Sequence, residues 1–230
     1  MLKQPNRLFV VSPHLDDAVF SCGTLLASHP ASVVCTVLAG APEVPQRKQW
    51  DVDSGFADSC AALTARLRED DHALALLAAD PVRLPFLDAQ YGAPRSMTRV
   101  AAALAGEVQQ RPDFMLLVPL GLWHPDHIFV SSACCEMLRM LKRCECIFYE
   151  DALYRTLPGV ARQRRELLAS LGFSLAAPSS ENPSQTAVRG AAAVKRRSAR
   201  AYRSQLRAFA DPYPNDLAEP ERYWQWSSHE

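Results

Sequence analysis

Two short groups of histidine and aspartate stand out in this sequence, and each directly follows an apolar run. His14-Leu15-Asp16-Asp17 comes after the run at 8–11, and His124-Pro125-Asp126-His127 comes after the run at 114–119. Imidazoles and carboxylates grouped in this way can bind a divalent metal ion or transfer protons. Two such groups in one chain predict a single site built from two neighbouring strand ends.

The ligand chemistry can be assigned within these groups. Two imidazoles and one carboxylate, His14, Asp17 and His127, match a catalytic Zn²⁺ or Fe²⁺ site, which keeps a position open for water. Asp16 is adjacent to Asp17, so their side chains diverge and only one of them binds the metal. We therefore expect Asp16 to face the water and to act as general base.

The second group adds further candidates for catalysis. His124 and His127 are three residues apart, so in a helical turn they would share one side. His127 could then bind metal while His124 faces the substrate, and Asp126 between them is a further catalytic candidate. Simpler structural roles remain open for each group: Asp16-Asp17 could cap a helix, and His124–His127 could be a capped turn.

The elements that must position these groups can be read from the hydrophobic pattern. The apolar runs predict strands at 8–11, 32–39, 82–87, 114–119 and 146–149. Helical spacing predicts helices at 18–28, 57–79, 96–110 with Ser96 as N-cap, 125–142, 160–170 and 190–209. Residues 41–56 are expected to form a polar loop, and the aromatic tail after 211 to pack on the domain. This alternation predicts an α/β protein with a mostly parallel sheet covered on both faces, in which ligands bind at the carboxyl ends of strands.

Bulk properties narrow the class of protein. A length of 230 residues predicts a single domain over 1–230. Lys plus Arg equals Asp plus Glu at 25 each, so no overall charge favours nucleic acid or an anionic membrane. No segment has the length of a membrane span or a signal peptide. Seven cysteines, an odd number set in apolar segments, indicate a reducing compartment and hence a cytoplasmic protein.

The two groups together resemble a known family. Pro13-His14-Leu15-Asp16-Asp17 with His124-Pro125-Asp126-His127 resembles the PIG-L (LmbE-like) family of metal-dependent N-acetylglucosaminyl deacetylases. Arg66-Leu67-Arg68-Glu69, Tyr149-Glu150-Asp151 and Ser204-Gln205 are also similar to that family's pattern, so the resemblance spans residues 8–210. It implies a Rossmann-like three-layer α/β/α fold and hydrolysis of an N-acetyl group from an amino sugar or its conjugate.

The resemblance also implies roles for individual residues. It implies His14, Asp17 and His127 as metal ligands, Asp16 as general base, His124 as the residue that stabilises the oxyanion or protonates the amine, and Arg66 as a substrate contact. Asp88 and Glu150 lie at strand ends and are candidate substrate-binding residues. The chain departs from the family pattern at Leu15 (usually Pro) and Ala18 (usually Glu), and at Leu122-Trp123, where some members place Gly and an oxyanion-contacting Tyr.

The expected function is therefore a hydrolase with one divalent ion per chain, Zn²⁺ by preference and Fe²⁺ as the alternative. Two other classes remain open from the residues alone: a metal-dependent phosphoesterase, and a non-enzymatic sugar-binding protein with a vestigial metal site. A phosphoesterase would normally need a second metal and more carboxylate ligands. The expected partner is a small amino-sugar conjugate, and the sequence leaves the formation of a homo-oligomer open.

Overall fold

Strand β1 (Leu8–Ser12) lies at the centre of the sheet because all five of its residues are apolar or small and all are buried. The structure is a computed structural model, and it describes residues 7–92, 95–142, 145–178, 189–209 and 213–227. The sheet has six strands in the order β3-β2-β1-β4-β5-β6. The other strands are β2 (Val33–Thr36), β3 (Asp80–Arg83), β4 (Met115–Pro119), β5 (Glu145–Tyr149) and β6 (Tyr223–Ser227). All neighbours pair in parallel except β5 and β6, which pair antiparallel, so the predicted α/β fold with a mostly parallel sheet is confirmed.

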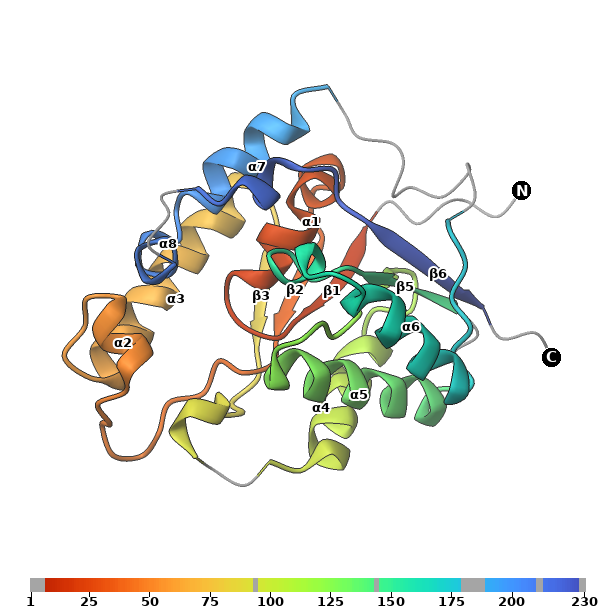
Figure 1. Ribbon diagram of the computed structural model, residues 1–230, viewed down its shortest axis with the longest axis horizontal. Coiled ribbons are helices and arrows are strands. Elements are labelled where there is room, and N and C mark those ends of the chain that lie inside the picture. Colours follow the sequence, from red (N-terminus) through yellow and green to blue (C-terminus); the bar gives the residue numbers. More distant parts are fainter. Residues whose placement is uncertain (1–6, 93–94, 143–144, 179–188, 210–212, 228–230) are drawn as a thin grey trace.

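Helices cover both faces of the sheet (Figure 1). They are α1 (Asp17–Ser28), α2 (Gln49–Asp53), α3 (Ser59–Leu76), α4 (Met97–Gln109), α5 (Pro125–Met140), α6 (Val160–Ser170), α7 (Ala191–Ala199) and α8 (Arg203–Ala208). Short 3₁₀ turns occur at Ala89–Tyr91, Tyr154–Thr156 and Asn215–Ala218. Helices α1, α3 and α7 lie on one face and α4, α5 and α6 on the other, while α2 lies beside α8 at the rim.

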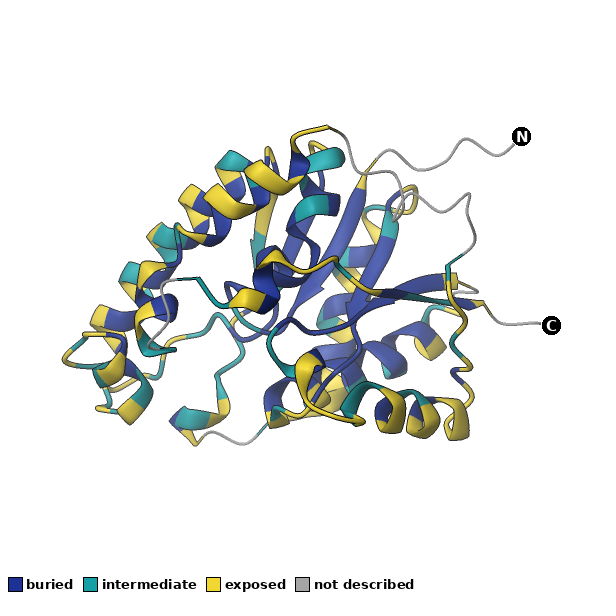
Figure 2. Cartoon of the chain, turned by 45° about the horizontal axis from the view of Figure 1, so that its top comes forward, coloured by how far each residue is buried: buried dark blue, intermediate teal, exposed yellow. Residues whose placement is uncertain are grey.

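Two hydrophobic cores, one on each face, hold the layers together. Successive strand residues point to opposite faces, so Phe9 and Val11 pack with α4 and α5 while Leu8 and Val10 pack with α1. Figure 2 shows the strands buried and the outer helix surfaces exposed. Because helices cover both faces of the sheet, a ligand can reach the strands only at their ends.

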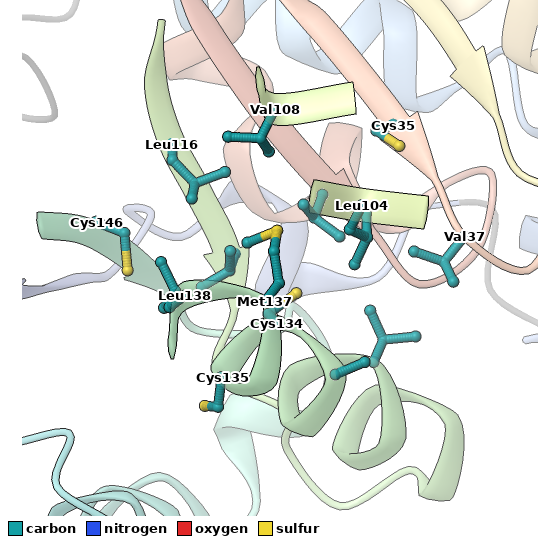
Figure 3. Packing of buried hydrophobic residues seen from close by; sticks show 14 of the residues in the cluster. Cys35, Val37, Leu104, Val108, Leu116, Cys134, Cys135, Met137, Leu138 and Cys146 are labelled. Atoms are coloured by element: carbon teal, nitrogen blue, oxygen red, sulfur yellow. The ribbon is translucent and has the colours of Figure 1, made fainter. Parts of the chain in front are cut away.

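The cysteines belong mainly to these cores. Cys35, Cys134, Cys135 and Cys146 pack among leucine and valine side chains on the α4–α5 face (Figure 3). Burial raises the pKa of Cys35 to about 12 and that of Cys135 to about 11. Cys35 and Cys135 are free and stay protonated at neutral pH, and all four side chains contribute to packing; Cys144 lies outside the described residues.

The structure corrects the expected elements at two edges of the sheet. The third strand spans Asp80–Arg83 and not 82–87, because Pro81 is tolerated in an edge strand and Pro85 cannot donate a ladder hydrogen bond. The aromatic C-terminal tail does more than pack on the domain, because Tyr223–Ser227 adds an antiparallel strand to β5.

Two further corrections affect the rim. The expected loop at 41–56 contains the short helix α2. The helix expected at 190–209 is broken into α7 and α8, and Tyr202 lies at the break, fully buried. The hydroxyl of Tyr202 donates to Asp70 Oδ1 at 2.8 Å, so the break places this ring in the core and turns α8 toward the rim. Within the described residues, no helix combines the length and the apolar character that crossing a membrane requires.

Candidate active site

The two histidine–aspartate groups meet because their strands are neighbours. β1 and β4 pair in parallel, with Val10 opposite Leu117, so both chains leave the sheet at the same edge. The ring of His14 lies 5.6 Å from that of His124 and 5.4 Å from that of His127, measured between centroids. The structure thus brings together one site from residues more than 100 positions apart in the chain.

Tight turns after the strands hold these groups in place. After β1, the hydroxyl of Ser12 donates to His14 O and accepts from the Ala18 N–H, which ties the start of α1 to the strand end. After β4, Gly121 has φ of +83°, and a Cβ there would lie 2.5 Å from Cβ of Ser131. Only glycine fits this conformation and this close approach to α5.

Three side chains form a candidate metal-binding group. Ligating atoms of His14, Asp17 and His127 all lie within 4.8 Å of one another. Asp17 Oδ2 lies 3.1 Å from His14 Nδ1 and 3.2 Å from His127 Nε2. The other ring nitrogen of His127 lies 2.6 Å from Asp151 Oδ1, which fixes the ring and leaves Nε2 to face the group. A carboxylate behind a ligating imidazole is usual in metal sites.

A second group of three also lies within ligating distance: His14, His124 and Asp126. Asp126 is fully buried, forms an ion pair with Arg95, and accepts a hydrogen bond from the Ala89 N–H at 3.3 Å. Both carboxylate oxygens of Asp126 therefore already have hydrogen-bonding partners within the protein. The group formed by His14, Asp17 and His127 is the better candidate to bind a metal ion.

Asp16 and Asp17 differ sharply in their electrostatics. Burial, together with the charge of Asp17, raises the pKa of Asp16 to about 7. Burial acts in the same direction on Asp17, but His127 and His14 outweigh it and hold its pKa well below its usual range. Asp16 occupies the N-cap position of α1 without a side-chain capping bond, so its carboxyl group is free for another role.

His124 combines a capping role with a position at the cavity. It is the N-cap of α5 with extended backbone, and its carbonyl accepts the helical hydrogen bond from the Ile128 N–H, so His124 and His127 lie on one side of the first turn, as expected, with their rings 5.4 Å apart. Its Nδ1 accepts from the Asp126 N–H at 3.2 Å, which leaves Nε2 as the N–H donor of the neutral ring. Burial, His14 and His127 all lower the pKa of His124, so the ring is neutral.

These side chains open into a cavity of about 480 Å³. Of the predicted site residues, it is lined by His14, Asp16, Asp17, Arg66, Asp88, His124 and His127. Its other walls are largely aromatic: Trp50, Tyr91, Trp123, Tyr154 and Phe209. Trp50 donates through its indole nitrogen to Gln205 Oε1 at 3.1 Å, and this bond joins α2 to α8 across the rim.

A family profile described as GlcNAc-PI de-N-acetylase, PIG-L, matches residues 9–138, which is more than half of the chain. The chain belongs to the PIG-L family. The match contains both histidine–aspartate groups and ends within α5. The resemblance found in the sequence is thereby confirmed.

Solved structures share the fold of this PIG-L protein at low sequence identity. The A40926 pseudoaglycone deacetylase Dbv21 is 22% identical with a TM-score of 0.76, over 98% of this chain and 100% of that one. A triple mutant of a deacetylase from teicoplanin biosynthesis is 24% identical with a TM-score of 0.77, over 96% and 97%. The N,N'-diacetylchitobiose deacetylase of Pyrococcus horikoshii is 16% identical with a TM-score of 0.51, over 94% and 76%. No curated protein sequence matches this PIG-L chain significantly.

The predicted substrate-binding residues of this PIG-L protein have different positions. Arg66 lies at the cavity wall, where its guanidinium is 2.8 Å from Asp51 Oδ1. Asp88 also lies at the wall and caps the turn at 89–91 by accepting from the Gln90 N–H. Glu150 does not line the cavity: it is 3% exposed and accepts from the Trp224 indole N–H on β6.

The predicted catalytic residue Asp126 also lies outside the cavity lining of this PIG-L site. It is fully buried and contacts His14 Nε2 at 3.2 Å, so it can act only by positioning that imidazole. Burial opposes its charge, but His14 and Arg95 hold its pKa well below the usual range.

Sequence reasoning missed the supports of the PIG-L site. Asp151 belongs to the Tyr149-Glu150-Asp151 pattern but had no role assigned, and it is Asp151 that contacts His127. Its other oxygen accepts from the Gly121 and Leu122 N–H groups at 2.8 and 3.0 Å. A second carboxylate at the end of the strand beside β4 was the only signal in the sequence. Nothing in the sequence pointed to Arg95 or Tyr154.

Proposed function

We propose that this PIG-L member is a zinc-dependent hydrolase that removes the N-acetyl group from an amino sugar or its conjugate. The observation that carries the proposal is the meeting of three ligating side chains, His14, Asp17 and His127, with Asp16 and His124 in one cavity. Family membership supplies the reaction class, an N-deacetylation.

His14, Asp17 and His127 would hold the ion. Two imidazoles and one carboxylate suit Zn²⁺, and Asp151 behind His127 supplies the outer support that such sites use. When bound, the ion would polarise the acetyl carbonyl and lower the pKa of water.

Asp16 would act as the general base. Its carboxyl group lies at the cavity next to a ligand, and burial raises its pKa to about 7, which suits proton transfer near neutral pH. It takes a proton from the water that attacks the acetyl carbon. The same carboxyl group then returns that proton to the nitrogen as the carbon–nitrogen bond breaks, which releases acetate and a free amine.

His124 would stabilise the oxygen on which negative charge develops. Its Nδ1 is occupied by the Asp126 N–H, so the neutral ring presents an Nε2–H donor. Because its pKa is lowered, the ring stays neutral, so Nδ1 keeps the lone pair that accepts from the Asp126 N–H and Nε2–H points to the cavity side as the donor. Of the two roles expected for His124, the geometry therefore favours the oxyanion contact.

Arg66 and Asp88 would bind the sugar. Arg66 is 8% exposed, and Asp51 and Ser54 hold its guanidinium. Its Nε is buried without a hydrogen-bond partner among the described residues, so a substrate hydroxyl could satisfy it. Asp88, which also lines the cavity and lies 3.9 Å from His14 Nε2, can accept a second hydroxyl.

The substrate class is an amino sugar that carries a further group. A deacetylase–teicoplanin complex from teicoplanin biosynthesis has the same fold, at 21% identity and a TM-score of 0.73. The volume of about 480 Å³ lies in the range of about 300–1,000 Å³ typical of sites for drug-sized molecules. We place the enzyme in a reducing, cytoplasmic compartment because five of its seven cysteines, Cys22, Cys35, Cys60, Cys134 and Cys135, are free thiols.

The test is a panel of N-acetylated amino-sugar conjugates assayed for acetate and free amine. Wild-type protein should release both in equal amounts, chelator should abolish release, and zinc should restore it. Because a teicoplanin deacetylase of the same fold has a zinc-inhibited form, zinc is added back to only one equivalent per chain.

The matched control is Asp16→Asn, which should keep the metal and lose turnover by about 10²–10⁴-fold. Phosphate release from an aryl phosphate without acetate release from any conjugate would refute the proposal. So would full activity of the Asp16→Asn variant.

A further inference from the structure

Trp123 lies at the mouth of the cavity in an unusual conformation. Its φ is +54°, in the left-handed region that bulky residues avoid, and its side chain is 60% exposed. It precedes His124 directly and lines the same cavity. Core packing does not explain an exposed indole ring on a strained backbone. Backbone strain of this kind concentrates at functional sites.

A second strained residue directly precedes another residue of the cavity wall. Among the described residues, five other than glycine have positive φ, and three of them, Ala31, Ala78 and Lys142, follow the C-terminal end of an α-helix by two or three residues. Left-handed conformations are ordinary at such ends. The remaining two are Trp123 and Leu153, and Leu153 is directly followed by Tyr154, which lines the cavity.

Trp123 and Tyr154 form a stacked pair that continues to the catalytic histidine. Their ring centroids lie 5.4 Å apart with planes inclined at 29°. Tyr154 is also nearly parallel to His124, at 5.9 Å and 28°, and meets His127 edge-on at 5.0 Å. The two aromatic rings therefore extend the cavity wall outward from His124.

The turn that carries Tyr154 is firmly anchored. Asp216 accepts from the Leu153 N–H at 2.6 Å and from Arg155 Nε at 2.9 Å. Arg155 also donates to Asp216 O at 2.8 Å and is 4% exposed. Residues on both sides of Tyr154 are thus fixed, so the tyrosine ring presents a defined support to Trp123.

We propose that Trp123, supported by Tyr154, is a specificity-determining residue that stacks against a second ring of the substrate, beyond the N-acetylated sugar. The proposal rests on the proposed deacetylase function. The chemistry recognised is a flat ring with an apolar face, such as an aromatic aglycone or a second pyranose, because an indole contributes a large rigid apolar surface to such a contact. The enzyme then prefers a conjugate to the free monosaccharide.

The test compares acetate release from three substrates: free N-acetylglucosamine, its aryl β-glycoside and its β-linked disaccharide. Trp123→Gly should lower kcat/KM for a conjugate by about 2- to 13-fold more than for the free sugar, the size of one aromatic contact. Trp123→Phe should restore most of the loss. The conjugate that loses activity identifies the second ring.

Stability separates recognition from a merely structural role. Glycine tolerates the left-handed backbone, so Trp123→Gly should unfold at the same or a higher temperature than wild type. The matched control is Lys142→Gly, at φ of +48° after α5 and outside the cavity, which removes a similar strain and should change no kinetic constant. An equal loss for all three substrates, no loss for any, or a lower unfolding temperature for Trp123→Gly would overturn the proposal.

Calorimetric binding keeps the proposal testable if the proposed function fails. Absence of acetate release from every substrate with wild-type protein would refute the deacetylase function. The aryl glycoside and the disaccharide would then be titrated into wild type and Trp123→Gly. Weaker binding of at least one conjugate to the variant, with Trp123→Phe restoring it, would support the stacking role, and equal binding of both would refute it.

Discussion

The carboxyl group of Asp16 should cost the metal-free protein stability at neutral pH. It is 7% exposed, and burial and then Asp17 raise its pKa from 3.8 to about 7. A pKa that is higher in the folded state means that the folded state binds the proton more tightly. The resulting stabilisation is complete below pH 3.8 and is lost as the pH rises through about 7.

The size of the effect follows from the pKa difference. A shift of about 3 pH units at about 1.4 kcal/mol each sets a ceiling of about 4 kcal/mol. Relaxation of the site and entry of water reduce this, so we expect ~2–4 kcal/mol. Asparagine carries no charge at any pH. Metal-free Asp16→Asn protein should therefore exceed wild type in free energy of unfolding by this amount at about pH 8 and match it near pH 4.

Asp17→Asn is the matched control, with the opposite sign. Burial also works against the charge of Asp17, but His127 and His14 outweigh it and lower its pKa below 3.8. The stability that Asp17 contributes is present above pH 3.8 and is lost as the pH falls below it. The same substitution one residue further along should therefore destabilise the metal-free protein at about pH 8.

The assay is urea unfolding followed by circular dichroism, in chelator, at intervals from about pH 4 to pH 8. At about pH 8, the free energy of unfolding should be higher than that of wild type for Asp16→Asn and lower for Asp17→Asn. At about pH 4, Asp16→Asn and wild type should have the same free energy of unfolding. It is refuted if both variants shift stability in the same direction, or if Asp16→Asn is no more stable than wild type at the alkaline end.

Three other substitutions test parts of the site separately, and a fourth tests its wall. His127→Ala should lose most of the bound metal while the circular dichroism spectrum stays unchanged, and elemental analysis decides this. Asp151→Asn should weaken metal affinity by about 10–100-fold, measured by competition with a chelator, because the His127 ring loses its carboxylate support. His124→Ala should keep stoichiometric metal and lower kcat, measured as acetate release, by about 10²–10³-fold. Asp51→Ala should cost about 3–5 kcal/mol of stability in urea unfolding, because it leaves the Arg66 charge buried without its partner.

The sheet and the site could be predicted because both depend on local sequence. Apolar runs such as 8–11 form buried strands wherever they pack, and polar groups at their ends must lie at one edge of a parallel sheet. This reasoning alone is enough to place His14 and His127 together. It also separates Asp16 from Asp17, since adjacent side chains diverge. The assignment of roles to these residues stays a prediction.

The supports of the site could not be predicted because they depend on partners distant in the chain. Arg95 meets Asp126, and Asp151 meets His127 across 24 residues, through packing that no short-range pattern encodes. Strand β6 was missed although Tyr-Trp-Gln-Trp is rich in the aromatic residues that favour strands, because a proline-rich approach to it suggested an irregular tail. The break at Tyr202 was missed because helix propensity is uniform there, and burial of one ring decides the local structure.

The contact between Asp216 and the turn at 153–155 also has a consequence during synthesis. The metal-binding side chains and Asp151 are all in place in the chain by residue 151, but Leu153 and Arg155 acquire their anchor only when residue 216 has been made. At about 5–20 residues per second, the intervening stretch takes roughly 3–12 s. During that interval the nascent chain already carries every group assigned to the proposed hydrolysis, while the turn that holds Tyr154 beside Trp123 still lacks its anchor.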